Sequence, residues 1–196
     1  MNIRFLLGTA SVVLTMASAV PFFRAVIKGS AKLERGAYTI WLVLPIIALI
    51  TQAIEGGTDS LGLAIGDTVT GLVFFGMIFK YGYGGVAKRD AAALILAGVG
   101  LGLWYLTNNP AFALYMAIVV DAIGSALIFV KAYESPESEV ASSWVLYIIG
   151  ALCALFAVSS TTFVLLAYPA YAVISSALIL ASQQVGYRRQ VHLGSS

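Results

Sequence analysis

Seven stretches of this chain are almost purely apolar, and each is close to the length that a helix needs to cross a bilayer. Apolar segments of about 17–25 residues are typical of membrane spans, because lipid offers the backbone no hydrogen-bond partners. Only 10% of the 196 residues are charged, whereas soluble domains carry roughly 25%. We therefore expect an all-α, polytopic membrane protein. Its seven expected spans are Phe5–Ile27, Ala37–Ile54, Leu61–Phe79, Ala91–Leu106, Ala111–Val130, Val140–Val158 and Thr161–Ala181.

Two of these segments allow another interpretation. The first has a basic start and the sequence "ASA" at Ala17–Ala19, which together are typical of a secretory signal peptide. Its apolar character continues through Pro21 to Ile27, so we expect an uncleaved helix. The fourth segment is short and rich in glycine, and a re-entrant helix is the alternative there.

The basic residues are distributed unevenly between the two sides of the predicted membrane. With the loop after the first span placed inside, ten of the eleven Lys and Arg residues lie on that side, and Arg4 lies on the other. Cytoplasmic loops carry such an excess of Lys and Arg. We therefore expect an N-terminus outside and a cytoplasmic polar tail at 186–196, most simply at the cell membrane.

The two halves of the chain repeat the same order of features. Lys28, Glu34 and Trp41 recur 103 residues later as Lys131, Glu137 and Trp144. Each half contains a helix with a basic end, a polar loop, a helix that begins near a tryptophan, a short outer turn and a third helix. A single linker helix between the halves would give both repeats the same orientation, related by an axis along the membrane normal. The predicted units are a triple-helix repeat at 1–83, a linker helix at 84–109 and a second repeat at 110–185.

This arrangement of three, one and three helices resembles the SWEET sugar transporters and their PQ-loop relatives. SWEETs carry prolines in the first two helices of each unit. In the first unit Pro21 and Pro45 match this pattern. In the second unit the equivalent positions hold Gly124 and Ile148, and Gly150 lies two residues after Ile148. The resemblance implies hinges at Pro21, Pro45, Gly124 and Gly150 and solute transport by alternating access. The Pro-Gln motif of PQ-loop proteins is absent, since Phe22 follows Pro21. Asp67 and Ala170 stand near the positions of the paired SWEET asparagines, so sugar specificity is not implied.

Asp67 and Asp121 are the charged residues that lie well inside predicted spans. Asp121 is about 16 Å of helix rise beyond Pro110, which places it near the bilayer midplane. A carboxylate at that depth costs on the order of 2.5–3.5 kcal/mol on insertion scales, so both should face protein or water. Helical spacing places Ala113, Ala117, Gly124 and Ser125 on the face of Asp121, and Ser60, Ala64, Thr70 and Gly71 on the face of Asp67.

Two interpretations of these carboxylates remain open. One is structural, with each Asp as a hydrogen-bonded clamp that holds a hydroxyl or a tyrosine of another helix. The other is functional, with one or both binding solute or carrying protons, because the two could meet across the central axis where such folds place substrate. Further candidates for solute contact are Gln52 on the second span and Tyr168, Tyr171 and Ser175, which share one face of the seventh.

The residue types present exclude several kinds of chemistry. The single cysteine, Cys153, forms no intramolecular disulfide, and the single histidine, His192, lies in the polar tail, so neither supports a metal centre in the membrane. We expect no enzyme activity, no cofactor and no nucleic-acid partner. The expected function is a carrier for a small cation, or for a polar solute moved with protons.

Three alternatives to a solute carrier remain. KDEL receptors resemble SWEETs in fold but bind peptides through a basic pocket, and vitamin permeases of similar topology use aromatic stacking. A non-transporting membrane subunit would instead use Gly98 and Gly102, which lie four residues apart and predict close helix packing, with a second copy of the chain as one partner.

Overall fold

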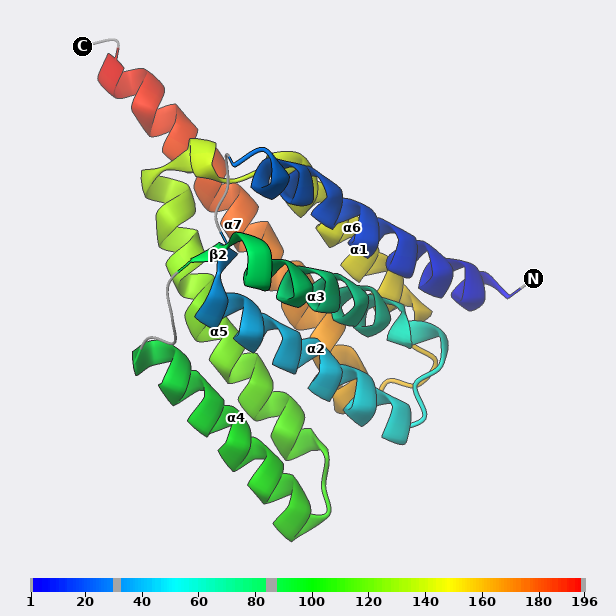
Figure 1. The fold of residues 1–196 in the computed structure, drawn as a ribbon. Coiled ribbons are helices and arrows are strands. Elements are labelled where there is room, and N and C mark those ends of the chain that lie inside the picture. Colours follow the sequence, from blue (N-terminus) through cyan, green and yellow to red (C-terminus); the bar gives the residue numbers. More distant parts are fainter. Residues whose placement is uncertain (1, 30–32, 84–87, 195–196) are drawn as a thin grey trace.

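The computed structural model describes residues 2–29, 33–83 and 88–194, and within them the chain forms seven α-helices packed as one bundle (Figure 1). The N- and C-terminal ends lie at opposite ends of the bundle, and α4 lies at its edge. The elements are α1 (Ile3–Ile27), β1 (Leu33–Glu34), α2 (Arg35–Ile54), η1 (Asp59–Leu61), α3 (Gly62–Tyr81), β2 (Gly82–Tyr83), α4 (Lys88–Thr107), α5 (Ala111–Glu134), η2 (Pro136–Ser138), α6 (Ala141–Ala157) and α7 (Phe163–Gly194).

Four of the described helices are long and apolar enough to cross a membrane: α1, α3, α5 and α7. The apolar segments of α2 and α6 are shorter, at Trp41–Ile54 and Ala141–Ala157. By length and composition, the chain is therefore an integral membrane protein built of helices.

For description, α1, α2 and α3 are called the first helix group and α5, α6 and α7 the second, and the most extensive contact of the bundle, between α1 and α6, joins the two. In the first group α3 packs against both α1 and α2, and in the second α7 packs against both α5 and α6. The groups meet where α1 lies along α6 and where α2 lies along α5, while α4 packs mainly on α5 (Figure 1). The largest cluster of buried apolar residues joins α2, α3, α5, α6 and α7 and includes Leu44, Leu63, Leu114, Ala151 and Tyr168.

Small residues let α1 approach its neighbours closely. Ser11, Thr15 and Ser18 lie on one buried face of α1. Opposite them on α6, a Cβ added to Gly150 would lie 3.0 Å from the Thr15 hydroxyl and 3.3 Å from Leu14 Cβ. Such close contact is how helices associate in lipid, where no hydrophobic effect drives them together. In this structure Gly150 is thus a packing residue. The resemblance implied a hinge at the same residue.

Pro110 and two asparagines form the turn before α5. Pro110 precedes the first residue of the helix, where its missing N–H costs nothing. The Asn109 side chain accepts a hydrogen bond from Ala111 N at 3.0 Å. Asn108 has a φ of 52°, a left-handed conformation that asparagine tolerates better than most residues.

Three features of the fold differ from the sequence predictions. Two residues each of β1 and β2 form a short parallel pair, Leu33 with Gly82 and Glu34 with Tyr83, which ties the loop after α1 to the end of α3. The helix predicted to end at Ala181 continues as α7 to Gly194, into the predicted polar tail. This extension packs against the end of α5, since an added Cβ at Gly186 would collide with the carbonyls of Ala132 and Tyr133.

The glycines of α4 differ in their surroundings. A Cβ added to Gly98 or Gly102 would meet nothing within 4 Å. Gly100 is the glycine that packs closely, with Met116 Cβ of α5 only 2.7 Å from its added Cβ. Within the described residues, Gly100 is therefore the glycine of α4 that packs closely, because the helix turns it toward α5, and packing of Gly98 and Gly102 against a partner subunit stays a prediction.

One buried glutamine fastens α7 to the loop between α5 and α6. Gln183 Nε2 donates to the carbonyl oxygens of Pro136 and Glu139, each at 2.8 Å. The Glu139 side chain also pairs with Lys131 at 3.2 Å and accepts from Trp144 Nε1 at 3.1 Å. One end of the second helix group is therefore closed by polar contacts.

We expect Gln183→Leu to lower the stability of the protein by about 1–3 kcal/mol, because it leaves two carbonyl groups without a donor. Gln184→Leu is the matched control, since Gln184 is exposed and surface changes usually stay within about 0.5 kcal/mol. Thermal unfolding in detergent measures both. Equal effects of the two substitutions would show that the Gln183 contacts contribute nothing.

Candidate functional site

Asp67 accepts two hydrogen bonds from the second helix group. Its Oδ2 lies 2.8 Å from the Tyr147 hydroxyl of α6 and 2.5 Å from the Tyr168 hydroxyl of α7. Asp67 belongs to α3, one turn after the buried residues Leu63 and Ala64. The carboxylate therefore connects the first helix group to two helices of the second.

Asp121 forms a second cluster, within α5 and α7. Its Oδ2 accepts from the Tyr171 hydroxyl and, at 3.1 Å, from Ser125 Oγ one turn along the same helix. Ser125 Oγ is also 3.2 Å from the Tyr171 hydroxyl, so the three groups form a closed triangle. Ser175, one turn after Tyr171, interacts with the same hydroxyl. The predicted residues Asp121, Ser125, Tyr171 and Ser175 are thus together.

The two clusters are joined through α7. Tyr168 and Tyr171 are three residues apart, so they project from one face of the helix on successive turns. Their hydroxyls bind Asp67 and Asp121 respectively. The two carboxyl groups are also close enough to interact electrostatically. The two acids are thus linked through neighbouring tyrosines of α7, and their meeting at a central solute site stays a prediction.

The surroundings of the carboxylates are mostly apolar. Ala113 and Ala117 precede Asp121 on its face and are at most 2% exposed, whereas both aspartates are half-buried. Among the described residues, no Lys or Arg pairs with either carboxylate. Each carboxylate is held by hydroxyl donors alone, which can also pass or receive protons.

Gln52, near the end of α2, is 0% exposed. Neither its amide nitrogen nor its amide oxygen has a hydrogen-bond partner in the described structure. A buried amide without partners costs free energy of about 1–3 kcal/mol per group. A polar ligand or an ordered water is the usual partner of such a group.

Other predicted residues lie apart from the carboxylates or serve the backbone. Thr70 lines a separate apolar pocket between α1 and α3. Pro21 and Pro45 lie inside α1 and α2, which continue through them. A Cβ added to Gly124 would meet only Trp41 Nε1, at 3.6 Å, so this part of α5 has space beside α2.

Sequence reasoning missed Tyr147, which donates to Asp67. The available signal was its position near the middle of an apolar helix, because a tyrosine far from the membrane interface needs a partner for its hydroxyl. It also missed Pro169, which lies inside α7 between the two carboxylate-binding tyrosines. Proline removes a helical hydrogen bond, so Pro169 is a point where α7 can bend.

No family model matches the chain, and comparison with curated proteins and with solved structures gave no match either. The functional inference therefore depends on the geometry of the two carboxylate clusters.

Proposed function

We propose that this protein is a membrane carrier that moves a small polar or cationic solute by alternating access, with protons as the coupling ion. The observation that supports it most directly is the pair of carboxylates, one from each helix group, bound by tyrosines on successive turns of α7. A carboxylate inside a membrane is costly, and most often lies on the path of a solute, an ion or a proton.

The packing of the helices is compatible with two parallel repeats around a central site. The contacts of α3 with α1 and α2 correspond to those of α7 with α5 and α6, and α1 on α6 corresponds to α5 on α2. On this proposal α4 is the linker, all seven helices span the membrane, and the N-terminus lies outside. Rocking would then occur at Pro21, Pro45, Gly124 and Pro169.

The chemistry of the site favours a cation over an anion. Two carboxylates and several tyrosine hydroxyls surround it, and no basic group of the described residues faces them. Tyrosine faces attract ammonium groups, and carboxylates pair with them. No group of side chains that could hold a metal ion accompanies the carboxylates among the described residues, and we propose binding and transport at this site.

A second candidate is a membrane subunit without transport activity. It is favoured by the open faces of Gly98 and Gly102, where an added Cβ would meet nothing within 4 Å among the residues that the structure describes. A second helix could pack there as small residues allow in lipid. Crosslinking of Gly98→Cys in a Cys153→Ser background would reveal such a partner.

Asp121→Asn should abolish or strongly reduce uptake by proteoliposomes and should remove its dependence on an imposed pH gradient. Asparagine keeps the size and can accept the Tyr171 hydrogen bond, but it neither binds a proton nor pairs with a cation. The assay uses a panel of radiolabelled amines, amino acids and sugars. Glu137→Gln removes an exposed acid and should leave uptake unchanged. Unaltered transport and pH dependence in Asp121→Asn would exclude Asp121 from the mechanism.

A further inference from the structure

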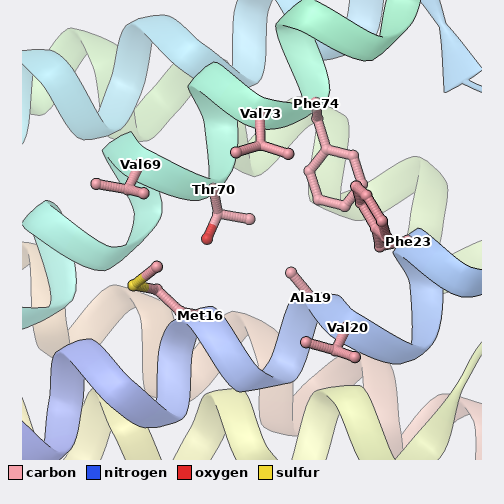
Figure 2. A pocket seen from close by; sticks show the side chains of 8 residues that line it. All are labelled: Met16, Ala19, Val20, Phe23, Val69, Thr70, Val73 and Phe74. Carbon is pink, nitrogen blue, oxygen red and sulfur yellow. The ribbon is translucent and has the colours of Figure 1, made fainter.

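An apolar groove of about 220 Å³ lies between α1 and α3, and neither aspartate belongs to its lining (Figure 2). Its lining includes Met16, Val20 and Phe23 of α1 and Val69, Val73 and Phe74 of α3. Figure 2 shows the Thr70 hydroxyl turned into the space between the two helices. Apart from this hydroxyl, the labelled side chains offer a ligand nothing polar.

The groove opens toward lipid rather than toward water. Met16, Val20 and Val73 are 42%, 43% and 46% exposed at its edges, and they belong to two of the long apolar helices. Pockets that enclose a drug-sized solute measure roughly 300–1,000 Å³. This groove is smaller and open, so it suits a length of hydrocarbon chain.

Positive charge stands at one end of the groove. Arg24 follows the groove residue Phe23 on α1, and Lys80 lies near the end of α3; both side chains are exposed. Lys80 lies eleven residues after Val69, or about 16 Å along the helix. That span is close to half of the roughly 30 Å hydrocarbon thickness. A lipid with its headgroup at Lys80 would therefore reach the inner end of the groove with its acyl chain.

We propose that the groove between α1 and α3 binds one acyl chain of an anionic phospholipid whose headgroup lies against Arg24 and Lys80. The apolar walls match the chain, and the two cations match a phosphodiester with a net negative charge. Anionic lipid is attracted by basic residues at the membrane surface. Zwitterionic lipid offers the same chain but a weaker charge match, so it should bind less tightly.

The test is native mass spectrometry of the full chain released from nanodiscs that contain equal amounts of phosphatidylglycerol and phosphatidylcholine. The wild type should retain phosphatidylglycerol preferentially. The double variant Arg24→Gln/Lys80→Gln should lose about ten-fold in this preference. Lys88→Gln/Arg188→Gln removes two other exposed basic residues and should keep it.

A second variant tests the groove independently of charge. Ala19→Phe fills the groove from its α1 wall and should reduce retention of both lipids. If that variant fails to fold, Val69→Phe, which fills the groove from a partly exposed position of the α3 wall, replaces it and should likewise reduce retention of both lipids. Equal retention of the two lipids by the wild type, or a preference that the charge variant leaves intact, would overturn the proposal.

Discussion

Gly62→Ala is expected to destabilise the protein more than any other single-methyl change on α3. Gly62 is the first residue of that helix, and an added Cβ would overlap the carbonyl oxygen of Gly8 on α1. A backbone carbonyl within a helix cannot rotate away, so α1 and α3 would have to separate. Overpacking costs typically 1–3 kcal/mol and occasionally more, and we expect the upper end of that range or beyond.

Gly76→Ala is the matched control on the same helix. A Cβ there would meet nothing within 4 Å, and the residue is exposed. Alanine has the better helix propensity by up to about 1 kcal/mol, so this variant should be neutral or slightly more stable. Thermal unfolding in detergent should show a melting temperature lower by roughly 6–12 °C for Gly62→Ala alone. Similar melting temperatures for both variants would mean that α1 and α3 are not in close contact at Gly62.

The positions of the helices and their inward faces could be predicted because each depends on a local pattern. Apolar length and helical spacing located α1, α3, α5 and α7, and the small residues that precede Asp67 and Asp121 are buried as expected. A turn such as that at Pro110 is equally local. These features need no knowledge of which helix lies beside which.

What could not be predicted depends on rotation about a helix axis and on the choice of neighbour. Thr70 shares a helical stripe with Asp67, yet it borders the apolar groove between α1 and α3, because α3 packs against α1 and α2 as well as against α6. Gly98 and Gly102 formed the obvious motif on α4, but Gly100 faces α5. The hydrogen bond from Tyr147 to Asp67 could not be predicted because it depends on α6 lying beside α3, which no local pattern shows.

The effect of Asp67 on stability can be separated from its effect on function. Asp67→Leu removes the acceptor of Tyr147 and Tyr168, and Tyr168 is only 3% exposed. Each buried hydroxyl left without a partner costs about 1–3 kcal/mol. Because two hydroxyls are affected, we expect a melting temperature lower by roughly 4–24 °C in detergent.

Removing the two hydroxyls as well should restore much of that stability. In Asp67→Leu/Tyr147→Phe/Tyr168→Phe all three polar partners are replaced by apolar groups of similar shape, which can be nearly neutral. If Asp67 serves only as a clamp between helix groups, this triple variant should recover uptake in proteoliposomes together with its stability. If Asp67 carries a proton or binds the solute, the triple variant should fold well and remain inactive. The carrier proposal requires the second result, because a phenylalanine pair restores packing but supplies no group that can exchange a proton with the Asp121 cluster.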